Sequence, residues 1–206
     1  MRAALIDYGS GNIASAAKAL SRAAAQTSGH EIVVTADPDM VRKSERIILP
    51  GVGAFADCMR GLSAVPGMVE ALNESVIQNG KPILGICVGM QVLFDAGVEH
   101  GEETAGLGVL RGRVEPLQAP VLPHMGWNTV TPAVGSVLFT GIPDGTRFYF
   151  VHSYAAHDTG GLVTTARHGE EFVAAVEDGV ISATQFHPEK SGDCGATLLS
   201  NWLATL

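Results

Sequence analysis

A short apolar segment that ends in a Gly-x-Cys-x-Gly turn constrains the fold of this chain more than any other feature. Residues 82–86 suit a buried strand, the turn spans residues 85–89 around Cys87, and the residues after it suit a helix. Two glycines in so tight a turn permit strained backbone angles and leave no side-chain bulk beside the central residue. The pattern therefore predicts a strand, a sharp elbow and a helix, with Cys87 lifted clear of the sheet edge.

Cys87 could be either a nucleophile or a packed structural thiol. At the predicted elbow its side chain would face a helix N-terminus, where free amide groups and the helix dipole favour a thiolate. A buried structural cysteine needs neither feature. We therefore interpret Cys87 as a candidate nucleophile.

The first half of the chain alternates apolar strands with helices. We expect strands over 3–7, 32–35, 46–49 and 83–87, and helices over 13–24, after Asp37-Pro38 and over 68–78. Such βαβ units favour a parallel sheet with helices on both faces, and functional groups gather at the carboxyl ends of its strands. Cys87 and the Pro50 to Gly53 loop both follow such ends.

The second half is richer in β structure. We expect antiparallel strands over 147–154, 162–166, 172–177 and 180–184, with a tight turn at Asp178-Gly179, and a helix over 193–206. The prediction is a flavodoxin-like α/β fold: a mostly parallel sheet with helices on both faces and antiparallel strands added in the C-terminal half. Without a repeat or a convincing linker, residues 1–206 are expected to form a single domain.

Composition excludes several classes of protein. Hydrophobic residues make up 46% of the chain and charged residues 17%, as in globular proteins. A net charge of -8 argues against nucleic-acid binding, because phosphate contacts need a basic surface. The seven histidines have no metal-ligand spacing, and the three widely spaced cysteines fit neither a disulfide framework nor a zinc site. With no signal peptide or membrane span visible, we expect a cytoplasmic protein without a metal or membrane partner.

A second group of polar residues follows the last predicted strand. His187 and Glu189 flank Pro188, a spacing that suits a base oriented by a carboxylate. His187 would take the thiol proton, and Glu189 would fix its tautomer and stabilise the imidazolium. Alone, the tripeptide reads as an inert surface turn. Beside a cysteine elbow on a neighbouring strand end, it predicts a Cys-His-Glu triad.

Attack of a thiolate on a carbonyl also requires donors for the oxyanion. The backbone amide of Val88, directly after the nucleophile, can be one donor. The loop of Gly51, Val52 and Gly53 could present a second amide, since its glycines allow close approach or a peptide flip. The alternative is an ordinary turn at the end of a strand.

The elbow and the His-Pro-Glu segment resemble the class I, triad-type glutamine amidotransferases. More selective segments, in the same order, resemble the glutaminase subunit of imidazole glycerol phosphate synthase. They are Ile6 to Ser15, Leu49 to Phe55, Pro123 to Asn128 and Phe150 to Tyr154. The match spans essentially the whole chain. Val88 stands where leucine is commoner, and Trp202 where phenylalanine is commoner, but neither difference affects the expected chemistry.

The resemblance implies a role for each matching position. Cys87 would form the glutamyl thioester, His187 would be the general base and then the acid, and Glu189 would orient it. Gln91 and Glu99 would hold glutamine, although Glu102 and Glu103 lie close by in a loop where the alignment is soft. The Gly51 to Gly53 segment matches an oxyanion strand whose amide must turn inward before turnover.

The resemblance also implies a partner. Ammonia would pass through an internal channel to a (β/α)₈ cyclase subunit in a heterodimer, with residues 124–128 facing that subunit. The products would be imidazole glycerol phosphate and aminoimidazole carboxamide ribonucleotide, in histidine biosynthesis. No cofactor is implied. Two alternatives remain: a class I glutaminase that serves another synthase, and a non-catalytic scaffold with the same fold.

Overall fold

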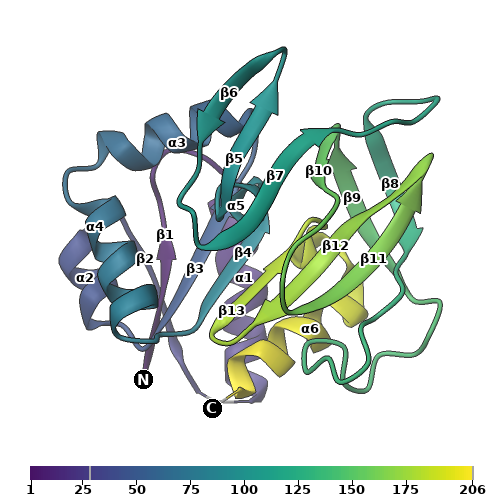
Figure 1. The fold of residues 1–206 in the computed structure, drawn as a ribbon. Coiled ribbons are helices and arrows are strands. Elements are labelled where there is room, and N and C mark those ends of the chain that lie inside the picture. Colours follow the sequence, from purple (N-terminus) through teal and green to yellow (C-terminus); the bar gives the residue numbers. More distant parts are fainter. Residues whose placement is uncertain (28, 206) are drawn as a thin grey trace.

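The fold is built on a seven-stranded sheet in which the expected parallel core is confirmed (Figure 1). The computed structural model describes residues 1–27 and 29–205. The strand order is β11-β12-β13-β4-β3-β1-β2; β2, β1, β3, β4 and β13 run parallel, and β11 and β12 are antiparallel additions. The order of the parallel strands is that of flavodoxin-like folds. Its strands are β1 (Arg2–Ile6), β2 (Glu31–Thr35), β3 (Arg46–Gly51), β4 (Ile83–Cys87), β11 (Leu162–His168), β12 (Glu170–Asp178) and β13 (Ile181–Thr184).

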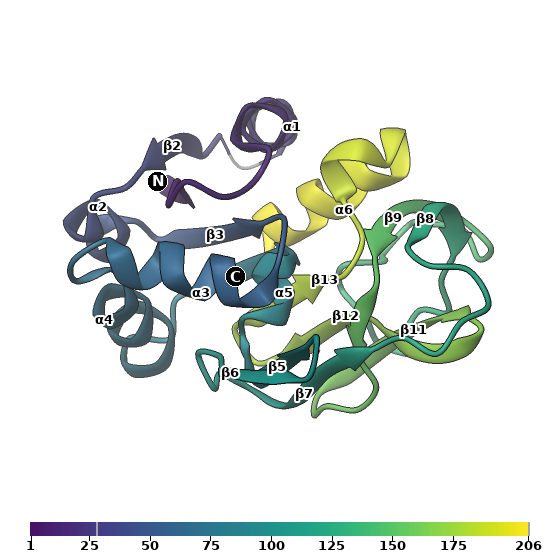
Figure 2. The ribbon, with the colours of Figure 1, turned by 90° about the horizontal axis from the view of Figure 1, so that it is seen from above.

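Helices cover both faces of this sheet (Figure 2). Helices α1 and α6 pack together on one face, and α3 and α4 lie on the other. Every residue of β3 and β4 is buried, as expected for strands covered on both sides. The helices are α1 (Ile13–Gln26), α2 (Pro38–Lys43), α3 (Phe55–Ala64), α4 (Met68–Asn73) with a π-helical turn η1 (Glu74–Gln78), α5 (Val88–Gln91), the 3₁₀ turn η2 (Pro188–Lys190) and α6 (Gly192–Ala204).

Local sequence explains where the helices begin. Asn12 accepts a hydrogen bond from the Ser15 amide at the start of α1, and Asp37 accepts one from the Asp39 amide at the start of α2. The expected helix over 68–78 is α-helical only to Asn73 and continues as a π-helical turn. Of the expected C-terminal helix, residue 206 lies outside the described part of the chain.

The predictions about the strands were incomplete at two points, and one helix was missed. The segment 147–154 does not join the main sheet: it forms β9 (Arg147–His152), paired with β8 (His124–Thr129), and the start of β10 (Tyr154–Ala156). A four-stranded sheet of β10, β7 (Leu110–Pro116), β5 (Phe94–Glu99) and β6 (Glu102–Ala105) was not expected. Helix α3 was also not predicted, although Phe55, Cys58 and Leu62 mark its buried face.

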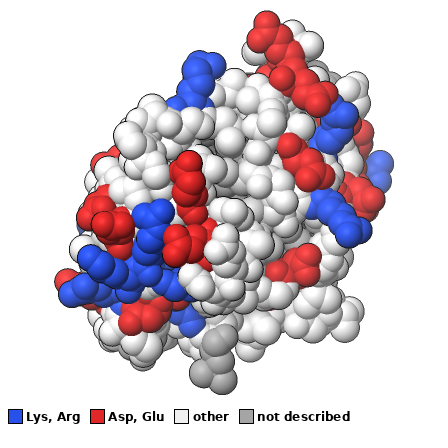
Figure 3. All heavy atoms as spheres, turned by 60° about the vertical axis from the view of Figure 1, so that its left-hand side comes forward, with Lys and Arg blue, Asp and Glu red and all other residues white. Residues whose placement is uncertain are grey.

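The surface carries both signs of charge. On the face drawn in Figure 3, basic and acidic side chains lie interspersed. Arg42, for example, pairs with both Asp39 and Glu74, at 3.1 and 2.8 Å. Within residues 1–27 and 29–205, no helix is long and apolar enough to cross a membrane.

Candidate active site

Cys87 ends β4 in a strained backbone conformation, with φ 56° and ψ -116°. A positive φ is uncommon for a residue other than glycine and is typical of functional turns. The turn has room for no other residue at its second glycine: a Cβ on Gly89 would lie 1.9 Å from the Leu49 carbonyl oxygen. The expected strand, elbow and helix are therefore confirmed, with β3 packed directly against the turn.

The Cys87 thiol borders a small cavity of about 190 Å³ at the carboxyl ends of β3 and β4. Its side chain is almost completely buried; the Sγ atom lies 3.9 Å from the Val151 carbonyl oxygen and 3.9 Å from the side-chain Nε2 atom of Gln185. The cavity is lined by Val52, Gly53, Cys87, Val88, Gln91, Glu99, Val151, His152, Ser153, Tyr154 and His187. Seven of the nine residues predicted to act in catalysis or binding therefore line one cavity. Of the other two, Gly51 pairs with Cys87 across β3 and β4, and Glu189 contacts His187.

His187 lies at the neighbouring strand end. Strand β13 pairs with β4 so that Thr184 stands opposite Ile86, which brings the segment after β13 beside Cys87. The His187 Nδ1 atom is 2.8 Å from Glu189 Oε1. Both side chains are buried, with 2% and 4% of their surfaces exposed. The His187 amide donates to the Tyr149 carbonyl at 2.9 Å, and Ser191 Oγ donates to the His187 carbonyl at 2.6 Å. The last two bonds fix the backbone of His187, and Glu189 holds its ring at Nδ1.

The charge state of His187 reflects opposing influences. Burial disfavours its protonated form, but the side chains of Cys87 and Glu189 outweigh burial and raise the pKa of His187 to about 9. Its Nε2 atom is buried and has no hydrogen-bond partner. The effect of Cys87 on the pKa shows that the thiol is the nearby group that could approach Nε2, and catalytic hydrogen bonds often form or tighten only when substrate binds.

The two candidate glutamine-binding side chains approach the cavity from different elements. Gln91 is buried in α5, and its Nε2 donates to the Tyr154 carbonyl and to Gln185 Oε1, each at 2.9 Å. Glu99 ends β5 and accepts a hydrogen bond from the Phe55 amide at 3.1 Å. Glu99 lines the cavity, whereas Glu102 and Glu103 lie on β6 outside its lining.

The predicted oxyanion loop has its central amide turned away from the thiol. The Val52 N–H donates to Ser10 Oγ at 3.3 Å, on the side of the loop that faces the segment after β1. Gly53 has φ +94° and open space where a Cβ would stand. An inward turn of the Gly51–Val52 peptide would therefore have to break the bond to Ser10.

Several residues around the site were not singled out from the sequence. The Gln185 side chain contacts both the Cys87 thiol and the side-chain amide of Gln91. The Tyr154 carbonyl accepts a second hydrogen bond from that Gln91 amide. The segment 150–154 carried the family resemblance, but no role was assigned to its members. Tyr8, Ser10 and Cys58 surround the oxyanion loop, and only their proximity in the fold distinguishes them.

A pair of buried histidines lies next to the site on β8 and β9. His124 Nδ1 and His152 Nε2 are 2.8 Å apart, and His152 Nδ1 lies 2.9 Å from the Tyr154 carbonyl oxygen. Burial and the neighbouring His168 lower the pKa of His124 to about 4. The same two influences contribute to the lowered pKa of His152, which is about 3. Both rings are therefore neutral at pH 7. In the described part of the chain, no group of three or more potential ligands could hold a metal ion.

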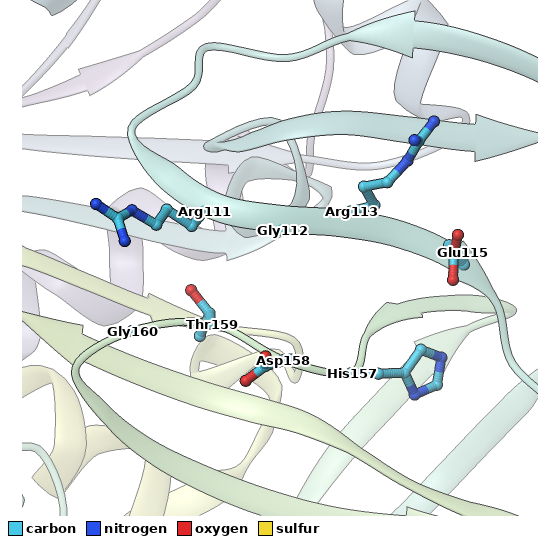
Figure 4. Close-up of a pocket in the computed structure, with 8 residues that line it drawn as sticks. All are labelled: Arg111, Gly112, Arg113, Glu115, His157, Asp158, Thr159 and Gly160. Carbon is cyan, nitrogen blue, oxygen red and sulfur yellow. The ribbon is translucent and has the colours of Figure 1, made fainter.

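A larger cavity of about 550 Å³ lies between β7 and the loop after β10 (Figure 4). It is lined by Arg111, Gly112, Arg113, Glu115, His157, Asp158, Thr159 and Gly160. It contains no cysteine, and Arg113 pairs with Glu103 while His157 lies 3.6 Å from Glu170. Its mixed charges and exposed rim give it no convergent chemistry, so the Cys87 cavity remains the candidate active site.

Known proteins resemble this chain along its whole length. Residues 4–206 match the family model for glutamine amidotransferase class-I. The imidazole glycerol phosphate synthase subunit HisH of Nocardia farcinica is 55% identical over an alignment of 212 residues that covers 98% of this chain and 97% of that protein. The protein of the same name from Mycobacterium tuberculosis is 52% identical over 203 residues, covering 97% and 95%.

Solved structures agree at the level of the fold. A crystal structure described as a glutamine amidotransferase has a TM-score of 0.72 at 20% identity and covers 98% of this chain and 99% of its own. A putative GMP synthase protein from Thermoplasma acidophilum has a TM-score of 0.68 at 19% identity, covering 98% and 92%. The chain belongs to the class-I glutamine amidotransferase family and, within it, to the imidazole glycerol phosphate synthase subunits HisH.

Proposed function

We propose that this chain hydrolyses glutamine to glutamate and ammonia with Cys87, His187 and Glu189, acting as one domain over residues 1–206. The observation that carries the proposal is that the carboxyl ends of β4 and β13 lie side by side. A cysteine on a strained elbow and a buried histidine, itself fixed 2.8 Å from a buried carboxylate, border one cavity. Nucleophile, base and orienting group are thereby present in one place.

The chemistry follows from these positions. His187 accepts the thiol proton at Nε2, and the Cys87 sulfur attacks the side-chain amide carbon of glutamine. The amide of Val88 donates to the oxygen that becomes negatively charged. Collapse of the tetrahedral intermediate breaks the C–N bond, and His187 returns its proton to the departing nitrogen, so that ammonia and a thioester form. Water, deprotonated by His187, then attacks the thioester and releases glutamate and the thiol.

Glutamine would be held at the opposite wall of the cavity. The Glu99 carboxylate, which lines the cavity, would bind the ammonium group of the substrate through an interaction between opposite charges. Gln91 contributes through its amide, which its bonds to Tyr154 and Gln185 hold in one orientation. Both assignments rest on the lining of the cavity and on the family resemblance.

The ammonia would pass to a cyclase subunit. The similar proteins are named as synthase subunits, and the resemblance implies a (β/α)₈ partner in a cytoplasmic heterodimer with an internal ammonia channel. On β8, Met125 is 66% exposed and Trp127 is 53% exposed, so this strand presents two large apolar side chains to solvent. The paired strand β9 supplies Val151, which borders Cys87. A partner on this ribbon would therefore sit beside the site.

The reaction of the complex would add ammonia nitrogen to a phosphorylated ribulosyl intermediate. It would produce imidazole glycerol phosphate and aminoimidazole carboxamide ribonucleotide, in histidine biosynthesis. Those chemical steps belong to the cyclase subunit. This chain supplies the nitrogen.

The deciding experiment uses Cys87→Ala in the complex with the cyclase subunit. We expect glutamine-dependent cyclisation to fall to background, while cyclisation from added ammonium salts continues at the wild-type rate. Loss of both reactions would contradict a purely glutaminase role. If a glutamine-analogue electrophile failed to label Cys87 in the wild-type complex, the chain would be a non-catalytic scaffold. If the chain supplied ammonia to a different synthase instead, it would be a glutaminase of another pathway.

A further inference from the structure

The carboxamide of Gln185 contacts two groups of the candidate active site, the Cys87 thiol and the Gln91 side chain. Strand pairing brings it there, because Thr184 at the end of β13 stands opposite Ile86 of β4, and the next residue of each strand follows. Gln185 is completely buried. Buried polar groups need hydrogen-bond partners, and this carboxamide has its partners in the site itself.

The direction of the Gln185 carboxamide follows from its neighbours. The Tyr154 carbonyl can only accept hydrogen bonds, so the Gln91 atom 2.9 Å from it is the nitrogen Nε2. That nitrogen also lies 2.9 Å from the Gln185 side chain and must meet an oxygen there, which is Oε1. The other end of the Gln185 carboxamide is therefore the nitrogen, and it lies 3.9 Å from Cys87 Sγ. An N–H donor thus faces the sulfur.

The Tyr154 carbonyl, on which this direction depends, is itself held by a second donor. His152 Nδ1 lies 2.9 Å from the same oxygen, so Nδ1 carries a proton. Nε2 of that neutral ring then accepts from His124 Nδ1 at 2.8 Å. Both lone pairs of the Tyr154 oxygen are in use. The carbonyl therefore holds Gln91, and Gln91 holds Gln185, in one orientation.

The two neighbours of the sulfur suit its two protonation states. The Val151 carbonyl oxygen, 3.9 Å from Sγ, can only accept, so it serves the protonated thiol. Once the proton has passed to His187, the sulfur is negatively charged and needs a donor. Gln185 Nε2 already faces it, so no rearrangement is required. Because hydrogen bonds to charged acceptors are shorter and stronger, the 3.9 Å contact should contract around the thiolate.

We propose that Gln185 is a catalytic residue, whose side-chain N–H donates to the Cys87 sulfur and stabilises the thiolate that attacks glutamine. The assignment rests on the proposed glutaminase function and adds a fourth side chain to its Cys-His-Glu triad. Gln185 keeps its own protons throughout. The thiol proton goes to His187, and the electron pair left on sulfur forms the bond to the amide carbon.

The test measures alkylation of Cys87 by iodoacetamide across pH, in the full chain and in its complex with the cyclase subunit. The thiolate displaces iodide as the C–S bond forms, and peptide mapping separates Cys87 from the other two cysteines. Gln185→Met keeps the length of the side chain but removes the donor. Loss of a hydrogen bond to a charged group should slow alkylation at pH 7 by about 10-fold or more. The pH profile should move upward by about one unit.

Two controls separate donation to sulfur from support of the cavity wall. Gln91→Met leaves the Gln185 donor in place and should keep the wild-type pH profile of alkylation, since no glutamine is present in this assay. Gln118→Met changes an exposed glutamine and should also keep it. An unchanged profile in Gln185→Met would overturn the inference. Equal shifts in Gln185→Met and Gln91→Met would also overturn it, because Gln185 would then act only by holding Gln91.

A second measurement needs no substitution and so holds even if Gln185→Met does not fold. In the wild type, one Nε2 proton resonance of Gln185 should shift downfield as the pH rises, with the midpoint found for Cys87 alkylation, because its hydrogen bond becomes charge-assisted. The side-chain resonances of Gln118 should not move. A Gln185 resonance that is independent of pH would overturn the inference.

The two proposals can fail separately. If the wild-type complex hydrolysed no glutamine, the proposed function would fail, while alkylation and the Gln185 resonance would still decide whether Gln185 donates to Cys87. If the complex hydrolysed glutamine but neither measurement responded, the glutaminase function would stand and the role of Gln185 would be overturned.

Discussion

His187 Nδ1 lies 2.8 Å from Glu189 Oε1, with both side chains buried where the chain leaves β13. The short Pro188 link makes this contact local, whereas the approach of His187 to Cys87 depends on the pairing of β13 with β4. The carboxylate therefore orients the imidazole and, together with the thiol, favours its charged form, whereas the sheet determines which group the imidazole can act on.

Glu189→Gln removes the charge of this pair but keeps its shape. Because Glu189 helps to raise the pKa of His187 to about 9, the variant should have a lower His187 pKa and a poorly stabilised imidazolium during turnover. We expect kcat of the complex to fall by about 10²- to 10⁴-fold with a smaller change in KM. Steady-state kinetics across pH would show both effects. Wild-type kcat in Glu189→Gln would remove Glu189 from the triad.

Glu99→Gln tests recognition of the substrate ammonium group. The variant keeps an acceptor for the Phe55 amide but loses the negative charge at the cavity. KM for glutamine should rise by about 10- to 100-fold, because a charge-assisted hydrogen bond becomes a neutral one. Glu102→Gln, on β6 outside the cavity lining, is the matched control and should keep the wild-type KM. If Glu102→Gln had the larger effect, the binding role would belong to that residue.

Gly89→Ala tests the packing of the elbow. Its new methyl group would lie 1.9 Å from the Leu49 carbonyl oxygen, so α5 would have to move away from β3. We expect the free energy of unfolding to fall by about 3 kcal/mol or more. Gly179→Ala is the control, since that turn glycine has φ +58° and open space, and only backbone strain of about 1 kcal/mol should result. Urea unfolding would measure both; equal losses would contradict the close contact.

The buried histidines predict a loss of stability on the acid side. His124 and His152 have pKa values of about 4 and 3 in the fold, whereas an unfolded chain binds these protons near pH 6.5. Lowered pKa values mean that stability is fully present above pH 6.5 and is lost as the pH falls toward the folded values. His187 does not change this loss of stability below pH 6.5, because there it is protonated in both the folded and the unfolded chain. Its raised pKa stabilises the fold at lower pH, and that contribution disappears as the pH rises toward 9.

Thermal or urea unfolding between pH 7 and 5 would measure this effect. Each histidine contributes a slope of at most about 1.4 kcal/mol per pH unit, so the pair should remove about 1 to 3 kcal/mol per unit below pH 6.5. The control variant His157→Gln, which changes an exposed ring, should keep the same steep dependence. A flat stability profile from pH 7 to 5 would show that the two rings are not held neutral.

Trp127→Ala tests the proposed partner surface. The ring is 53% exposed and contacts Tyr149 edge-on at 6.1 Å between centroids, so its removal should cost the isolated subunit little stability. Binding to the cyclase subunit should weaken by about 10-fold or more, as for an exposed aromatic anchor. Isothermal titration would measure it, with Val134→Ala, a 95% exposed apolar residue on another segment, as the control. Equal affinities for Trp127→Ala and the wild type would place the partner elsewhere.

Much of the site could be predicted because its signals are local. The turn around Cys87 needs glycines at fixed positions, and the His187 to Glu189 spacing allows a direct contact, so short stretches of sequence carry both features. The roles of these residues in catalysis stay predictions. Helix α3 was missed because its buried positions are few, and β5 to β7 were missed because their short strands alternate weakly with polar residues.

The sequence by itself determined the alternation of strands and helices, the elbow at Cys87 and the family to which the chain belongs. Each depends on residues near one another in the chain. Only the tertiary structure decided that Gln185 contacts Gln91, that His124 pairs with His152, and that the Val52 amide is bonded to Ser10. These contacts join segments from separate strands, and their geometry depends on strand register and packing, which no local pattern specifies.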